Sequence, residues 1–134
     1  MSKTESRGRY HGRILFMDDE EAIRDLIGML LRSHGYEVTL VGDGDGVVTA
    51  YNDAISRGPR YDAVVLDLSV PGGNGAKEVI DTLLAVDPGV QAIVSSGHAQ
   101  DPVMTDPVAY GFAEALLKPY TITVLLAKLE GLIF

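Results

Sequence analysis

The sequence predicts a doubly wound α/β domain built on a five-stranded parallel sheet. Short apolar runs of strand length alternate along the chain with segments in which apolar residues recur at helical spacing. The runs are apolar on both faces, so helices are expected to cover both sides of the sheet. Crossovers between parallel strands are right-handed almost without exception, which leaves few topologies for such a chain.

Five apolar runs have the length and composition of buried strands. They cover residues 13–17, 37–41, 63–66, 90–95 and 115–117. Each run is too short for a helix of its own, which favours strands. The third run is more apolar than the two before it and leads directly into Asp67.

Helical spacing between and after these runs predicts five helices. They span residues 20–33, 47–56, 76–86, 101–110 and 121 to the C-terminus. In the first helix, apolar residues recur from Ala22 to Leu31, and Gly35 is the expected C-cap. The fourth helix contains Pro102 and Pro107, which should make it short or irregular. Thr121 is the expected cap of the last helix.

Composition and charge limit the classes of function. The chain has 134 residues, which fits one domain, and its formal net charge is -8 with a sequence pI near 4.7. Direct nucleic-acid binding is not expected, because it requires a basic surface that neutralises phosphates. The absence of cysteine excludes disulfides, zinc–thiolate sites and a cysteine nucleophile, and it agrees with a cytoplasmic location.

The N-terminal segment is expected to lie outside the domain. Residues 1–12 are polar and basic and lack the apolar core of a signal peptide, so we interpret them as a flexible leader or linker remnant. The domain itself is expected over 13–134. No apolar run in the chain approaches the ~18 residues that a membrane span requires.

Polar side chains stand at the carboxyl ends of four expected strands, where ligands bind in an open parallel sheet. The first strand ends in Asp18-Asp19, the third in Asp67, the fourth in Ser95-Ser96 and the fifth in Lys118-Pro119. Each motif alone has an ordinary structural explanation, such as a helix cap for the acidic pair. Their joint occurrence at four strand ends favours a functional site.

The residue types at these ends suit phosphoryl transfer. Three carboxylates at one edge repel one another unless a cation compensates them, and a hard divalent ion such as Mg²⁺ takes oxygen ligands. A lysine and a hydroxyl can bind phosphoryl oxygens. Together with a carboxylate nucleophile and a metal, they would form a site that works through an aspartyl phosphate.

These motifs together resemble the receiver domain of bacterial response regulators, and the resemblance covers 12–134. The family pattern has an acidic pair, an aspartate, a Ser or Thr followed by a small residue, and Lys-Pro at the same four strand ends. Pro71 and Gly75 also match the family's loop after the aspartate. The sequences of segments 67–75, 96–98 and 101–104 are similar to those of receivers attached to hybrid histidine kinases. The resemblance implies a flavodoxin-like (βα)5 fold with strand order 2-1-3-4-5.

The resemblance also implies roles for the acidic residues and the kind of partner that the protein would have. Asp67 is the expected phosphoacceptor, and it would take its phosphoryl group from a histidine kinase or phosphotransfer domain. Asp19, Asp67 and the backbone carbonyl of Ser69 would bind Mg²⁺ directly, and Asp18 would act through a coordinated water. The protein would not be an enzyme with a free substrate, and a receiver homodimer is a candidate assembly.

The switching residues match the family with one departure. Ser96 would move toward the phosphoryl group and is preferred to Ser95 because the small Gly97 follows it. Lys118 would pair with the phosphoryl group. Many receivers carry Tyr or Phe three residues before this lysine, but here the residue is Ala115. Phe112 and Tyr120 are the candidates to replace that aromatic.

Other functions fit the sequence less well. An aspartyl-phosphate hydrolase usually carries an Asp two residues after its nucleophile, where this chain has Ser69. A nucleotide- or flavin-binding domain would need a glycine-rich loop after the first strand to bind phosphate. Here the segment after that strand, 18–21, is acidic and would repel phosphate in the absence of a metal. The segment 42–46 lacks the Glu of a calcium loop and is expected to be a strand-to-helix loop. A degenerate receiver that acts only through protein contacts stays open because of Ala115.

Overall fold

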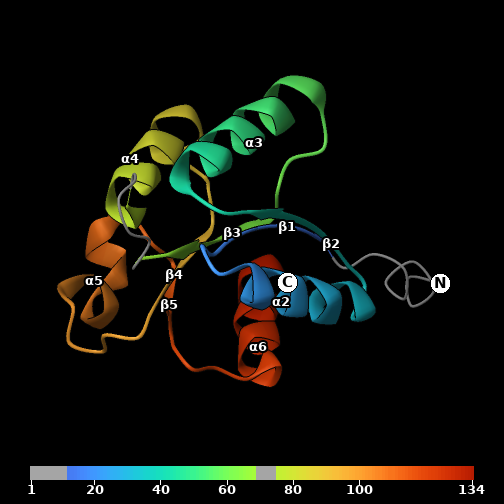
Figure 1. Cartoon of the computed structure of the whole chain (residues 1–134). Coiled ribbons are helices and arrows are strands. Elements are labelled where there is room, and N and C mark those ends of the chain that lie inside the picture. The colour runs from blue at the N-terminus through green and yellow to red at the C-terminus, as the bar shows by residue number, and fades with distance from the viewer. Residues whose placement is uncertain (1–11, 69–74) are drawn as a thin grey trace.

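The computed structural model describes residues 12–68 and 75–134, and these form a parallel sheet with helices on both faces (Figure 1). The strand order is β2-β1-β3-β4-β5, which confirms the predicted fold class. The strands are β1 Gly12–Met17, β2 Tyr36–Val41, β3 Ala63–Asp67, β4 Ala92–Ser96 and β5 Glu114–Leu117. The helices are α2 Glu21–Ser33, α3 Gly44–Arg57, α4 Ala76–Val86, α5 Pro102–Thr105, the 3-10 helix η1 Pro107–Tyr110 and α6 Ile122–Ile133. Within these described ranges, no helix is long and apolar enough to cross a membrane.

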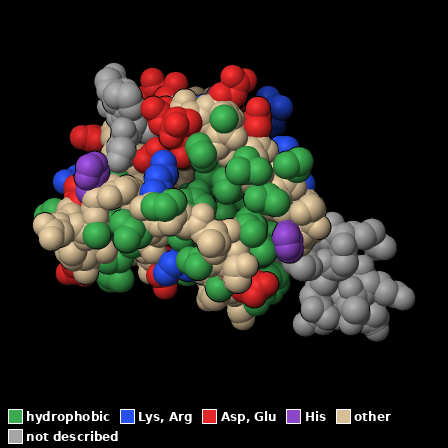
Figure 2. All heavy atoms as spheres, turned by 60° about the horizontal axis from the view of Figure 1, so that its bottom comes forward, with side chains coloured by type: hydrophobic (Ala, Val, Ile, Leu, Met, Phe, Trp, Pro, Cys, Tyr) green, Lys and Arg blue, Asp and Glu red, His purple; other side chains and the backbone are tan. Residues whose placement is uncertain are grey.

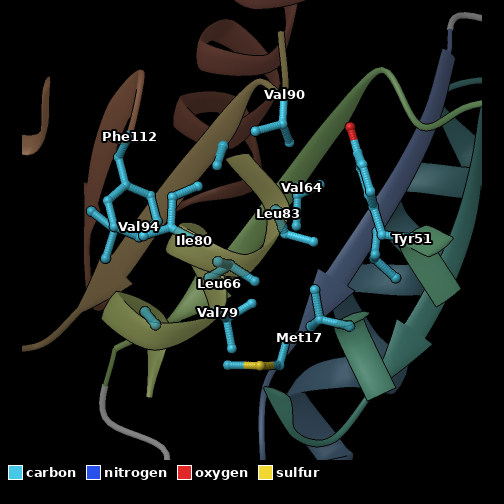
Figure 3. Packing of buried hydrophobic residues seen from close by; sticks show 14 of the residues in the cluster. Met17, Tyr51, Val64, Leu66, Val79, Ile80, Leu83, Val90, Val94 and Phe112 are labelled. Carbon is cyan, nitrogen blue, oxygen red and sulfur yellow. The ribbon is translucent and has the colours of Figure 1, made fainter. Parts of the chain in front are cut away.

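The sheet separates two apolar layers. The layer beside α3, α4 and α5 contains Leu66 and Val94, and Figure 3 shows side chains of the sheet and the helices packed together there. The layer beside α2 and α6 contains Phe16 and Val65. Successive residues of a strand point to opposite faces, which is why the neighbours Val65 and Leu66 belong to different layers. The same alternation decides on which face each polar residue at a strand end lies.

Two helix boundaries differ from the sequence prediction. Helix α3 begins at Gly44 instead of about residue 47, because the Asp43 side chain accepts a hydrogen bond from the Gly46 N–H at 2.8 Å and caps the helix. The helix expected over 101–110 is divided into α5 and η1, which meet at Asp106 and Pro107. Proline lacks the N–H that would continue the helix through this point.

Two contacts near the C-terminal end of α4 stabilise the layer beside α3 and α4. The buried Tyr51 of α3 donates a hydrogen bond to Asp87 Oδ2 at 2.6 Å. Burial, and then the hydrogen bond and charge of Asp87, raise the pKa of Tyr51 above its ordinary value. Gly111 adopts a left-handed φ of 97°, and a Cβ atom there would lie 2.8 Å from the Leu84 side chain. Glycine is therefore required at this turn.

Candidate functional site

Three carboxylates gather where β1 and β3 end. Asp18 directly follows β1, Asp67 is the last residue of β3, and these two residues are only 1% and 2% exposed. Asp19 is exposed, and one carboxylate oxygen from each of Asp18, Asp19 and Asp67 lies within 4.8 Å of the other two. The structure thus brings together the three acidic residues that the sequence singled out. Carboxylate oxygens at this spacing are suitable ligands for a hard divalent cation.

Local hydrogen bonds fix the position of Asp18. Its backbone N–H donates to the Val41 carbonyl at 3.2 Å, which continues the pairing between β1 and β2. Its carbonyl oxygen accepts from Arg24 at 2.8 Å, and its Oδ1 accepts from the Glu20 N–H at 2.9 Å. The residue is therefore held by the start of α2 as well as by the sheet, and Oδ2 faces the site.

Lys118 connects two of the carboxylates from the other side of β4. Its Nζ lies 2.9 Å from Asp18 Oδ2 and 3.0 Å from Asp67 Oδ2, and its side chain is 25% exposed. Burial acts to lower the pKa of the Lys118 ammonium, but the hydrogen bonds and charges of Asp18 and Asp67 outweigh burial and raise that pKa above its ordinary value. The lysine is therefore charged at neutral pH and offsets the repulsion between the two buried carboxylates.

The two serines at the end of β4 are both buried, and Ser96 is engaged by the loop that follows. Its Oγ accepts a hydrogen bond from the His98 backbone N–H at 3.0 Å. Within the described residues, this hydroxyl has no hydrogen bond to Asp67 or Lys118. The predicted switching hydroxyl thus lies one strand away from Asp67 and is held by its own loop. Ser69, the predicted backbone ligand, lies outside the described residues.

Ala115 of β5 lies in the layer beside α3 and α4. It pairs with Val94 in the register between β4 and β5 and packs against that layer. Phe112 is buried in the same layer, whereas Tyr120 packs on the opposite face of the sheet, beside α2 and α6. Tyr120 therefore does not fill the place of the aromatic that Ala115 replaces, and Phe112 is the candidate that shares a layer with Ala115.

A groove of about 390 Å³ lies beside Lys118. It is lined by Glu20, Ile23, Leu26, Ile27, Lys118, Pro119 and Tyr120. Figure 2 shows hydrophobic side chains gathered on this face of the molecule and acidic side chains gathered along one rim. The Tyr120 hydroxyl is buried, and over residues 12–68 and 75–134 it has no hydrogen-bond partner. Burial is the main cause that raises the pKa of Tyr120 to about 12, with smaller contributions from Asp18 and Asp67 and an opposing one from Lys118.

Two features of the site were not expected from the sequence. One is the contact from Arg24, which reaches back along α2 to the Asp18 carbonyl. The other is that Lys118 divides its hydrogen bonds between Asp18 and Asp67. Lys118 stands beside a strand end, but this does not specify which oxygens it contacts, and no signal in the sequence indicated the contact of Arg24.

Comparison with known proteins establishes the family. The family model of the response regulator receiver domain matches residues 14–130. The chain therefore belongs to the response regulator receiver domain family, whose members are signalling proteins of two-component systems.

The curated relatives are response regulators. The transcriptional regulatory protein FixJ of Bradyrhizobium diazoefficiens is 31% identical over 122 residues, which cover 91% of this chain and 57% of FixJ. The DNA-binding response regulator MtrA of Mycobacterium tuberculosis is 27% identical over 119 residues, which cover 89% of this chain and 49% of MtrA. The chain spans about half the length of the curated relatives it matches.

Solved structures of receiver domains share the fold. The receiver domain of the sensor histidine kinase PA1611 from Pseudomonas aeruginosa PAO1, which has a magnesium ion coordinated in its active site cleft, superimposes with a TM-score of 0.78 at 27% identity. The match covers 91% of this chain and 97% of that one. The response regulator TrrA from Thermotoga maritima, in complex with Mg²⁺ and BeF, has a TM-score of 0.75 at 25% identity and covers 91% and 99% of the two chains.

Proposed function

We propose that the chain is a phosphoacceptor switch in which Asp67 receives a phosphoryl group from a phosphohistidine of a partner kinase or phosphotransfer domain. The observation that carries this proposal is the contact of Lys118 Nζ with both Asp18 and Asp67, beside the exposed Asp19. A carboxylate oxygen of Asp67 would attack phosphorus as the phosphorus–nitrogen bond to the histidine breaks. The imidazole would leave with its electron pair, so no other reactant is needed.

A divalent cation fits the donor set of this site. Asp19 and Asp67 would bind Mg²⁺ directly together with the Ser69 carbonyl, and Asp18 would act through a coordinated water. The ion would neutralise charge on the phosphoryl group during transfer. Lys118 would pair with a phosphoryl oxygen and so keep one positive charge beside the negative charge that transfer brings.

The output would be a conformational change after phosphorylation. Ser96 would exchange its hydrogen bond with the His98 backbone for one with the phosphoryl group, which would move the loop after β4. A ligand or modification shifts such an equilibrium only through contacts that differ between the two states, and this exchange supplies one. Autocatalytic phosphorylation and dephosphorylation, a cytoplasmic location and a receiver homodimer complete the proposal. The acidic net charge argues against direct nucleic-acid binding by this chain.

A degenerate receiver that acts only through protein contacts is the second candidate. The observation in its favour is Ala115, which removes an aromatic side chain from β5 next to the proposed switch. Such a protein would keep the fold and its contact surfaces but would not respond to phosphorylation.

Intact mass after incubation with acetyl phosphate and Mg²⁺ distinguishes these candidates. The wild-type protein is expected to gain one phosphoryl group, Asp67→Asn to gain none, and a chelator to prevent the gain. Asp53→Asn is a matched control, because Asp53 is a surface residue paired with Arg57. A folded wild-type protein that gains nothing would support the degenerate receiver, and a gain that survives Asp67→Asn would place the acceptor elsewhere.

A further inference from the structure

Ser95 is a buried residue beside the site, and its hydroxyl has no partner within the described part of the chain. The residue is 2% exposed, and its Oγ has no hydrogen-bond partner among the residues that the structure describes. Most buried hydroxyls in proteins are hydrogen-bonded, because a buried polar group without a partner loses the water that would otherwise bind it. A hydroxyl of this kind at the edge of a reactive site calls for an explanation.

Ser95 lies on the same face of the sheet as Asp67. The two residues pair in the parallel register between β3 and β4. Two residues earlier on each strand, Val65 and Ile93 pack in the layer beside α2 and α6. Side chains two residues apart on a strand share a face, so Ser95 and Asp67 are neighbours on this side. Ser96 points to the opposite side.

Lys118 reaches from the end of β5 past the end of β4 to the carboxylates beyond it. Strand β4 lies between β5 and β3, and the Lys118 backbone N–H donates to the Ser96 carbonyl at 2.8 Å. Its Nζ nevertheless contacts Asp67 on β3 and Asp18 after β1. An ammonium has three N–H donors, and two of them are used by these carboxylates. The side chain therefore passes over the end of β4 where Ser95 lies.

We propose that Ser95 is a positioning residue for Lys118. Its hydroxyl accepts a hydrogen bond from the ammonium when Lys118 turns from Asp67 Oδ2 to a phosphoryl group on Asp67, so the inference rests on the proposed function. In the unphosphorylated protein, the two carboxylates are stronger acceptors than a neutral hydroxyl. After transfer, Asp67 carries an acyl phosphate and its own oxygens accept weakly. Ser95 then directs the ammonium without adding a negative charge that would repel the phosphoryl group.

Pairs of variants of matched shape test the role of the hydroxyl. Wild type is compared with Ser95→Ala, and Ser95→Thr with Ser95→Val, because threonine and valine have the same shape. The rate of phosphorylation by acetyl phosphate and Mg²⁺ is measured by intact mass. The variants without a hydroxyl should be about tenfold slower, which corresponds to the loss of one hydrogen bond to a charged group. In a Lys118→Met background, the variants with and without a hydroxyl at residue 95 should be phosphorylated at the same rate.

Thermal unfolding of the unphosphorylated variants separates positioning from a structural role. Ser95→Ala should melt at the same temperature as wild type or higher, because it removes a hydroxyl that has no partner in this state. Equal phosphorylation rates within each pair would overturn the proposal. A slower rate accompanied by a lower melting temperature would also overturn it, because that result describes a merely structural serine.

A third comparison is independent of phosphorylation. Asp67→Ala releases one N–H of Lys118, which Ser95 should then accept, so in this background Ser95→Val should melt several degrees below Ser95→Thr. Equal melting temperatures would overturn the assignment of Ser95. If wild type takes up no phosphoryl group, the proposed function fails, and this comparison still decides whether Ser95 can hold Lys118.

Discussion

Replacing Lys118 with methionine would remove the cation between two buried carboxylates and keep a side chain of similar length. Lys118 Nζ lies 2.9 and 3.0 Å from oxygens of Asp18 and Asp67, which are almost completely buried. At an effective dielectric constant of about 20, each contact corresponds to a gross attraction of roughly 5–6 kcal/mol, much of which offsets desolvation. Removing one partner of a buried ion pair leaves an uncompensated charge. We therefore expect the free energy of unfolding at neutral pH to fall by about 3–5 kcal/mol.

Urea unfolding followed by circular dichroism measures this loss. Lys128→Met is the matched control, because Lys128 Nζ lies 2.9 Å from Glu114 Oε1 but the two side chains are 28% and 44% exposed. Its loss should stay below about 1 kcal/mol. Millimolar Mg²⁺ should recover part of the loss in Lys118→Met, since a bound metal ion relieves the repulsion between the carboxylates. If the two variants unfold at the same urea concentration, the reasoning about the site is refuted.

Three further substitutions test the packing around the site. Tyr120→Phe removes a hydroxyl without a partner, so its free energy of unfolding at neutral pH should equal or exceed that of wild type. Because the folded-state pKa of Tyr120 is raised from 10.0 to about 12, the unfolded chain loses this proton first, and wild type loses stability between these pH values. Tyr120→Phe should lose less in an alkaline titration, and an identical titration would contradict the assigned burial. Tyr51→Phe leaves the buried side of Asp87 without its donor and should cost about 1–2 kcal/mol in urea unfolding, and an unchanged midpoint would contradict this. Gly111→Ala places a Cβ atom 2.8 Å from a side chain of α4 at a left-handed φ and should cost about 1–3 kcal/mol, whereas Gly89→Ala, with its nearest contact at 3.5 Å, serves as the control and should change stability little.

The sheet and the acidic cluster could be predicted because strand ends carry local signals. The apolar run before Asp67 stops at that residue, and the run before Asp18 does the same. Since parallel strands end at one edge of a sheet, these two local observations suffice to bring the carboxylates together. The contact between Lys118 and Asp18 is different, because 100 residues separate them and the contact depends on β4 lying between β5 and β3.

The start of α3 and the orientation of the serines could not be predicted. Glycines around Asp43 indicated a loop, but the capping bond of its side chain begins the helix there. The choice between Ser95 and Ser96 rested on Gly97 alone. Successive residues of a strand lie on opposite faces, so Ser95 shares the face of Asp67 and Ser96 lies on the other face. The family pattern selects Ser96, but it does not describe where the serine hydroxyls point in the unphosphorylated protein.

The position of Lys118 also affects how the edge of the sheet opens. Strand β5 has four residues, and in the described part of the chain it pairs only with β4. A short strand that is paired on one side has few contacts to hold it, and regions with few contacts open locally more often than the core of the sheet. Lys118 follows β5 directly and ties it to the ends of β1 and β3. When the ammonium leaves these carboxylates, the β4 ladder alone holds the strand on this side. The exchange rate of the Lys118 amide, which donates to the Ser96 carbonyl at 2.8 Å, therefore reports whether the lysine still occupies its place among the aspartates.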